Sequence, residues 1–295
     1  MLPERTVLLN DPNPPALAVV MAPLGALPLV AAFAVWSALG VLALVAAAFL
    51  LARLADPTQR ARLFPFAILA PTSLIAIAEG QTTPFVLVAI AGSLAAPPFW
   101  SGALLGMTAF RPQLLPLVAL VALAERRRAI GLVVTVAAIA VASFATVGPE
   151  GMARYPALLT LAATELRPGE LGIVALVRRL LGGGEIALNA TLGGLVLAVG
   201  ALAIFARSRT TSARIVDGST WSLLAAPHAL LHDAVMAYPA VARAATSTRA
   251  TAIWAGSGIL VALLHEAGLP LASLWLLALW WWGRPAGTER GPIRP

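Results

Sequence analysis

The residues of this sequence that could take part in chemistry are the few polar ones outside its arginine clusters. They are Asp11, Glu79, Gln81, Arg111, Glu150, Glu165, Glu170, His228, His232, Asp233, His265 and Glu266. His228 and His232 are four residues apart, which places them on one face of a helix at a spacing compatible with metal ligation. Two histidines with one neighbouring aspartate are a weak metal signal, and structural histidines are at least as common. No metal site is therefore predicted, and any need for a divalent cation is left open.

The composition shows which solvent these residues must work in. Of the 295 residues, 60% are hydrophobic and 11% are charged, whereas a soluble domain carries about 25% charged residues. This chain has too few polar side chains to cover a water-soluble globule of its size, which excludes a cytosolic enzyme. At roughly 20 residues for each spanning helix, the chain can cross a bilayer many times.

The charged residues indicate how the chain is oriented. All 20 basic residues are arginines, and they give a net charge of +7. They lie in short clusters between apolar runs, as the cytoplasmic anchors of membrane helices do. Because no basic stripe with interleaved aromatic residues is present, nucleic acid is not expected as a partner. The absence of cysteine excludes disulfides, thiolate nucleophiles and cysteine-bound metals.

The apolar runs predict one multi-spanning membrane domain over residues 1–283, followed by a short cytoplasmic tail, 284–295. The expected spans and shorter runs are 27–54, 63–78, 84–96, 101–110, 114–124, 129–147, 186–205, 250–264 and 269–282. The long loop 148–184 falls on the outer side. Its segment 173–181 has helical spacing and is predicted to lie in the membrane interface, with Arg178 and Arg179 opposite its apolar stripe.

The run 217–243 is interrupted at Pro227-His228 and again at His232-Asp233. Read as one crossing, it would place the C-terminal arginines outside. Two half-helices that meet near the outer side would keep Arg243, Arg249 and the tail inside, so the charges favour this second interpretation.

The stretch 83–124 predicts a polar pocket. It is too short for three full crossings at about 17 residues each, so its helices must be short or broken, and Arg111 should lie below the outer surface. Irregular backbone and a charge at that depth are tolerated only where they line a protein cavity or a water-filled one. The remaining polar residues fall on the same side in this topology. The sequence therefore predicts a pocket that opens outward.

Several motifs together resemble a known family. They are Asn13-Pro14-Pro15, Glu79-Gly80-Gln81, Gly106 to Gln113 with Arg126-Arg127-Arg128 after the next helix, Gly169-Glu170-Leu171-Gly172 followed by Val177 to Leu181, and Ala226-Pro227-His228 with His232-Asp233. Their order and spacing resemble the polyprenol-phosphate-mannose-dependent mannosyltransferases of glycosyltransferase family 87, in the glycosyltransferase-C superfamily. The resemblance runs from about Asn10 to Arg243. The family usually has lysine where this chain has Arg111, so the positive charge is kept.

This resemblance implies an all-α, polytopic bundle of about 9–11 transmembrane or half-membrane helices in the plasma membrane. It implies inverting transfer of a sugar, by resemblance mannose, from a polyprenyl-phosphate donor to a lipid, glycan or protein hydroxyl on the extracytoplasmic face. No cofactor beyond that donor is expected. The sequence starts after the point where the family has a first helix and a first-loop aspartate, which leaves Asp11 as the nearest acid.

The resemblance also implies roles for individual residues. Asp11 and Asp233 are the candidate catalytic carboxylates, since a carboxylate can take the proton of the acceptor hydroxyl. The candidate ligands of the donor phosphate are Arg111, Arg178, His228 and His232. Gln81 and Glu79 are the candidate sugar-binding residues.

Two other functions are compatible with the same pattern. Broken helices around a polar cavity also suit a transporter or flippase of lipid-linked intermediates. Without the first helix and its aspartate, the chain could instead be an inactive scaffold.

Overall fold

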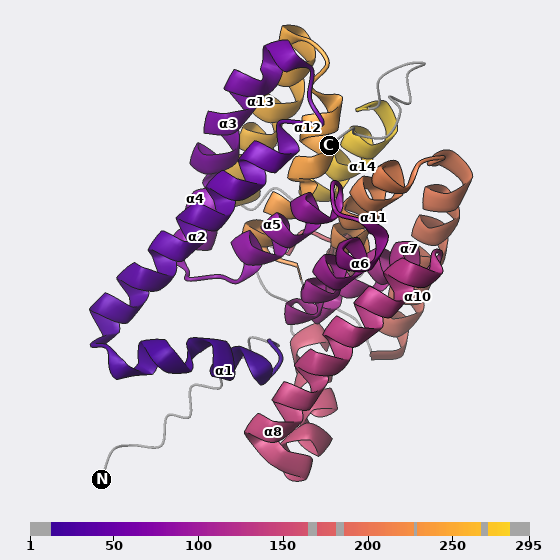
Figure 1. Ribbon diagram of the computed structural model, residues 1–295. Helices are drawn as coiled ribbons and strands as arrows, with labels where there is room; N and C mark the ends of the chain where they lie inside the picture. Colours follow the sequence, from indigo (N-terminus) through magenta and orange to yellow (C-terminus); the bar gives the residue numbers. More distant parts are fainter. Residues whose placement is uncertain (1–12, 165–169, 181–185, 227–228, 267–270, 284–295) are drawn as a thin grey trace.

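The computed structural model describes residues 13–164, 170–180, 186–226, 229–266 and 271–283. These residues form helices and turns and contain no strand (Figure 1). The elements are α1 (Ala16–Met21), η1 (Ala22–Ala26), α2 (Leu29–Leu51), η2 (Pro57–Gln59), α3 (Arg60–Leu69), α4 (Pro71–Ala78), α5 (Thr83–Ser93), α6 (Pro98–Gly106), η3 (Met107–Phe110), η4 (Pro112–Leu114), α7 (Leu115–Leu123), α8 (Arg126–Thr164), α9 (Ile173–Leu180), α10 (Ile186–Arg207), α11 (Thr211–Ala225), η5 (Leu231–Ala237), α12 (Tyr238–Ala244), α13 (Thr248–Glu266) and α14 (Ala272–Trp282).

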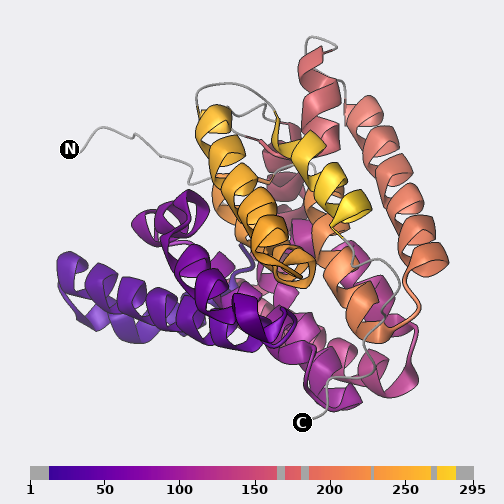
Figure 2. The same ribbon diagram turned by 90° about the horizontal axis from the view of Figure 1, so that it is seen from above.

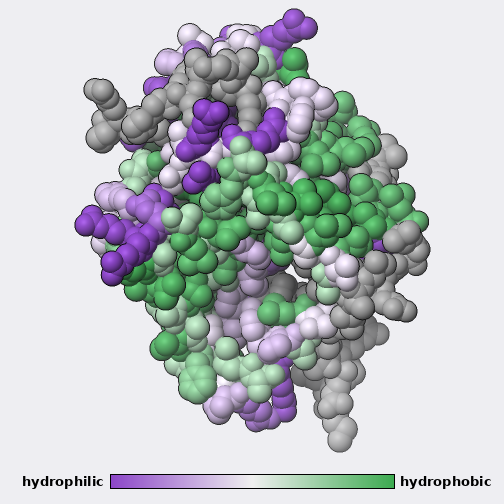
Figure 3. Space-filling view, turned by 90° about the vertical axis from the view of Figure 1, so that its right-hand side faces the viewer, coloured by the Kyte–Doolittle hydropathy of each residue, from purple (hydrophilic) through white to green (hydrophobic). Residues whose placement is uncertain are grey.

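Long apolar helices confirm an all-α polytopic membrane protein. Within the described ranges, four helical segments are long and apolar enough to cross a bilayer: Leu29–Leu51, Pro57–Ala78, Arg126–Thr160 and Ala190–Arg207. Large apolar side chains on them face outward; Leu29, for example, is 85% exposed. Figure 3 shows a broad hydrophobic region across the middle of one face, with hydrophilic residues gathered toward its ends. Such a surface suits contact with lipid rather than water.

Two of the arginine-bearing loops meet at one end of the bundle. Arg62 donates a hydrogen bond from Nη1 to Thr248 Oγ1 (2.6 Å), and the Asp56 amide donates to the carbonyl of Ala245 (3.3 Å). These contacts join the loop after α2 to the loop before α13. Seen from above, α13 and α14 lie side by side between the α2–α4 side of the bundle and α10 (Figure 2).

The chain between residues 83 and 124 is broken into short helices, as predicted. None of α5, α6 and α7 exceeds 11 residues, and η3 and η4 join α6 to α7. Close packing against α8 holds this region in place. A Cβ on Gly102 would lie 1.8 Å from the carbonyl oxygen of Arg128, and one on Gly131 would lie 2.0 Å from that of Phe99. Glycine is required at both positions because the helix backbones approach so closely.

The interrupted run forms two half-helices, as the charges indicated. Helix α11 ends at Ala225, and the chain resumes as η5 and α12. At the end of α12, Arg243 donates from Nη2 to Asp217 Oδ1 (2.6 Å) and from Nη1 to the carbonyl of Ala213 (3.4 Å). Because these partners lie in the first half of α11, the end of α12 returns to the start of α11. The segment is a re-entrant hairpin.

The long loop 148–184 differs from its prediction in two respects. Helix α8 continues past a kink at Gly148 (φ +66°) to Thr164, and α9 forms where the interfacial helix was expected. The expectation that Arg178 faces away from the buried side was wrong. Its side chain is buried together with Val174, one turn earlier, and it pairs with the buried Glu170 at 4.0 Å. The apolar stripe did not identify the buried face, because a charged pair occupies part of it.

Candidate functional site

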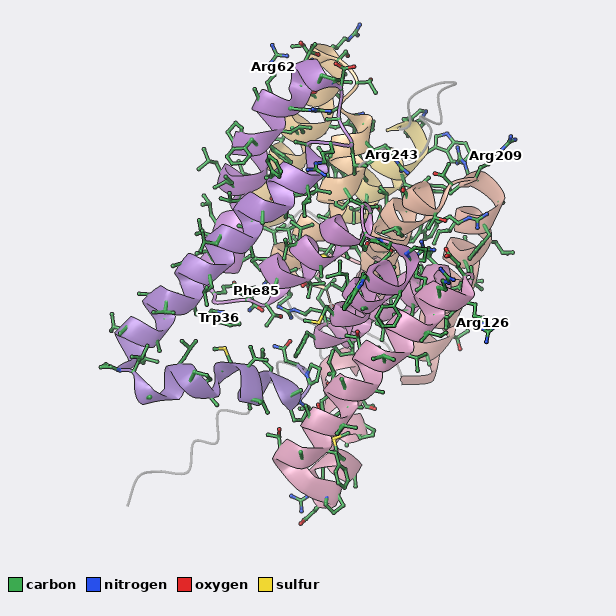
Figure 4. The ribbon with its side chains drawn as sticks, in the orientation of Figure 1. Trp36, Arg62, Phe85, Arg126, Arg209 and Arg243 are labelled. Carbon is green, nitrogen blue, oxygen red and sulfur yellow. The ribbon has the colours of Figure 1, made fainter. Side chains whose placement is uncertain are left out.

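A fixed turn carries the first group of site residues, Glu79-Gly80-Gln81, between α4 and α5. Gly80 has φ +64°, a conformation that other residues adopt at a cost. Its carbonyl accepts a hydrogen bond from Trp36 Nε1 (2.8 Å). The Trp36 ring in turn lies 4.7 Å from that of Phe85, and both are labelled in Figure 4. The turn is therefore attached to α2 on one side and to α5 on the other.

Arg111 provides the buried cation of the site. It lies between η3 and η4 and is 3% exposed. Its Nη2 donates to Gln81 Oε1 and, at 3.4 Å, to Thr83 Oγ1. Its Nε lies 3.7 Å from Asp233 Oδ1, an ion pair that joins residues 122 positions apart in sequence. The prediction that this arginine is recessed is confirmed.

Asp233 lies where the chain resumes after the re-entrant break. Its Oδ2 accepts from the Leu230 amide (3.1 Å), so the carboxylate caps η5. Its Oδ1 accepts from Thr83 Oγ1 (3.3 Å) and faces Arg111. Both carboxylate oxygens therefore have partners, and the side chain is 1% exposed.

His232 joins the buried part of the site to its surface. Its Nδ1 lies 2.6 Å from Glu79 Oε2, and the Glu79 side chain is 48% exposed. Gln81 Nε2 also reaches Glu79 Oε2, at 3.5 Å. The other ring nitrogen, His232 Nε2, is buried 3.8 Å from Asp233 Oδ1 and makes no hydrogen bond to any residue that the structure describes. The cluster thus runs from a buried cation to a half-exposed carboxylate, an arrangement that can hold an anion and move a proton.

A comparison with protein families matches residues 12–227 to glycosyltransferase family 87. This chain belongs to that family. It is therefore a membrane glycosyltransferase, and family membership favours sugar transfer over transport. The matched segment includes Glu79, Gln81, Arg111 and Arg178 but ends before His232. No curated protein and no solved structure matches the chain significantly.

The structure of the glycosyltransferase brings together most of the residues that the sequence predicted. Glu79, Gln81, Arg111, His232 and Asp233 form one cluster through the contacts above. Asp11 and His228 lie outside the described residues, and their roles stay predictions. Among the residues that are described, no three histidine, aspartate or glutamate side chains are placed to hold a metal ion.

Arg178 lies on a segment packed against the break in the re-entrant hairpin. The Leu171 amide donates to the carbonyl of Ala229 (2.7 Å), which fixes the start of α9 beside that break. Glu170, in the same segment, is 2% exposed. The buried pair of Glu170 and Arg178 therefore supports the loop next to the site.

The glycosyltransferase has one site residue that sequence reasoning missed. Thr83 donates to Asp233 and accepts from Arg111, so it lies between the two charges. In the sequence it follows a polar turn and precedes Pro84, which reads as an ordinary helix start. Only the return of residue 233 to this turn gives Thr83 its partners.

An apolar groove adjoins the cluster on the other side of η5. Its walls enclose about 440 Å³ of empty space, open solvent included. Its walls include Phe66 and Pro71 of α3 and α4, Ala262 of α13, Trp275 of α14, and Leu231 and Ala234 of η5. Because Leu231 and Ala234 flank His232 and Asp233 in sequence, one short helix separates the groove from the charged cluster.

Proposed function

We propose that this glycosyltransferase moves a sugar from a polyprenyl-phosphate donor to a hydroxyl of a lipid, glycan or protein on the extracytoplasmic face of the plasma membrane. The observation that carries the proposal is the buried Arg111 in a polar cluster next to an apolar groove. Mannose is the sugar that the family resemblance suggests. A single displacement at the anomeric carbon would invert its configuration.

The charged cluster suits the leaving group of this reaction. When the sugar departs from its donor, negative charge develops on the phosphate, and a preorganised cation stabilises it. Arg111 is such a cation, because Gln81, Thr83 and Asp233 hold it in place. With its carboxylate oxygens engaged, Asp233 is a positioning residue for Arg111 in this proposal, in place of the catalytic role expected from the sequence.

The groove suits the lipid part of the donor. Burying a prenyl chain against apolar side chains is favourable by roughly 0.8 kcal/mol for each CH₂ group. Because η5 contributes Leu231 and Ala234 to the groove and His232 and Asp233 to the cluster, the proposal places the lipid of the donor in the groove and its phosphate at the cluster.

The family resemblance suggests the extracytoplasmic face. Nucleotide sugars are absent from that side, so a lipid-linked donor is needed there. In Figure 4, Arg62, Arg209 and Arg243 lie above Trp36 and Phe85, the residues beside the Gly80 turn, whereas Arg126 lies level with them.

The test uses membranes that contain the full chain and radiolabelled polyprenyl-phosphate mannose as the donor. We expect transfer by the unaltered protein and a 10²- to 10³-fold loss in Arg111→Gln, which is the usual effect of removing one charge-stabilising donor. Arg154→Gln is the matched control, because Arg154 is 78% exposed in a pair with Glu150. Equal transfer by Arg111→Gln and the control, at equal protein levels, would refute the role of Arg111.

A further inference from the structure

Three aromatic side chains line the apolar groove. Phe66 comes from α3, Tyr238 from the start of α12, and Trp275 from α14. The rings of Phe66 and Tyr238 lie against each other, with their centroids 5.2 Å apart. The Tyr238 hydroxyl is hydrogen-bonded to the hydroxyls of Thr72 (2.6 Å) and Ser73 (2.7 Å). These two rings therefore form a wall whose orientation is fixed.

Trp275 is held in place by two contacts with α13. Its Nε1 donates a hydrogen bond to Ser257 Oγ (2.9 Å). A Cβ on Gly258 would lie 2.9 Å from Trp275 Cζ2, so the missing side chain at this glycine makes room for the indole. Both contacts restrict rotation of the ring. Because the only polar atom of the indole is engaged, the ring presents apolar surface to the groove.

Many of the other lining residues are small. Among them are Ala70, Ala234, Ala262 and Ala272. Alanine loses no side-chain entropy when it is buried, so these walls need no ordering when a lipid enters. In a groove that is formed in advance, the main cost of this kind is the ordering of the lipid itself.

We propose that Trp275, together with Phe66 and Tyr238, determines specificity for a donor whose prenyl chain carries double bonds. This inference rests on the proposed function and names the class of lipid that the groove accepts. In an unsaturated chain, one bond of each prenyl unit cannot rotate, whereas every bond of the saturated counterpart can. The saturated chain therefore loses more conformational entropy when the groove orders it.

The aromatic walls add a second preference for the unsaturated chain. The face of an aromatic ring carries negative charge in its quadrupole and attracts the positive edges of other planar groups. A double bond and its substituents form such a planar group, with C–H bonds at its edge. A saturated prenyl unit has the same methyl branch but is not flat, so it fits less closely between Trp275 and the wall of Phe66 and Tyr238.

Competition between two donors tests this specificity in membranes that contain the full chain. The donors are radiolabelled polyprenyl-phosphate mannose and its fully saturated counterpart, which has the same chain length and methyl branches. The double bonds take no part in the chemistry, because the bond that breaks joins the sugar to the phosphate. We expect the unaltered protein to favour the unsaturated donor about tenfold in kcat/KM, which corresponds to about 1.4 kcal/mol.

Two variants of the aromatic wall should lower this ratio. Trp275→Leu keeps an apolar side chain but removes the ring, and we expect the ratio to fall to about threefold or less. Ser257→Ala keeps the indole but removes the hydrogen bond that orients it, so the ratio should fall in this variant too. Trp282→Leu is the matched control, because Trp282 lies on the same helix, is 70% exposed and is not part of the groove.

The ratio distinguishes specificity from a merely structural role, because both donors are measured on the same membranes and misfolded protein lowers both rates equally. Equal use of the two donors by the unaltered protein would overturn the inference and leave the proposed function in place. The same ratio in Trp275→Leu and Trp282→Leu would also overturn it. Transfer from neither donor would instead reject the proposed function, and the specificity assignment with it.

Discussion

Loss of the Arg243 side chain should destabilise the re-entrant hairpin that carries the site. Asp217 is fully buried and bonded to Arg243 at 2.6 Å, with a second bond from Ser208. Removing one partner of a buried ion pair leaves an uncompensated charge, at a cost of about 3–5 kcal/mol. Because the Ser208 bond remains in Arg243→Ala, we expect a loss in the free energy of unfolding near the lower value, about 3 kcal/mol.

The matched control is Arg154→Ala, which breaks the exposed pair with Glu150. Both side chains of this pair are 78% exposed, and exposed pairs contribute only about 0–1 kcal/mol. At roughly 2–4 °C for each kcal/mol, thermal unfolding in detergent should shift down by about 6 °C or more in Arg243→Ala and by little in the control.

A compensating double variant sharpens this test. Asp217→Asn with Arg243→Met removes both charges, so it should recover much of the stability lost in Arg243→Ala. The reasoning would be refuted by equal melting temperatures in Arg243→Ala and Arg154→Ala, or by a double variant less stable than Arg243→Ala.

Two further predictions concern the groove and the helix packing. Ala262→Phe should fill the apolar groove and raise the KM for the donor. The control is Ala255→Phe, on the same buried face of α13 but outside the groove, which should leave the donor KM unchanged. Equal donor KM values in the two variants would contradict a lipid site. Gly131→Leu should prevent α6 and α8 from packing together, because even a Cβ there would lie 2.0 Å from the Phe99 carbonyl oxygen. The yield of monodisperse protein in detergent should therefore fall, whereas the control Gly194→Leu, at a position with open space, should keep its yield.

The sequence predicted the architecture well because a bilayer imposes simple rules. Long apolar runs had to be helices, and arginine clusters had to share one side. The same charge argument favoured two half-helices over one crossing, and the contact between Arg243 and Asp217 bears this out. Arg111 stood out because it lies in a stretch too short for full crossings, and it is buried.

The pairing of site residues could not be predicted from the sequence. Glu79 and His232 are 153 positions apart, and Thr83 and Asp233 are 150 apart. Their contacts depend on how the hairpin packs against the Gly80 turn, a tertiary arrangement that no local pattern encodes. Periodicity also misplaced Arg178, because a helical stripe ranks residues by apolarity and cannot recognise a buried charge with a buried partner.

The breaks in the helices and the chemistry of the site have a common physical basis. Each interruption exposes backbone groups that lipid cannot satisfy, and at three of them the structure supplies a partner: Trp36 for the Gly80 carbonyl, Asp233 for the Leu230 amide, and Ala229 for the Leu171 amide. Asp233 does this while holding Arg111. A side chain that allows a helix to stop inside the membrane therefore also positions the cation proposed for the donor phosphate. We infer that substitutions which remove such caps would impair folding and transfer together.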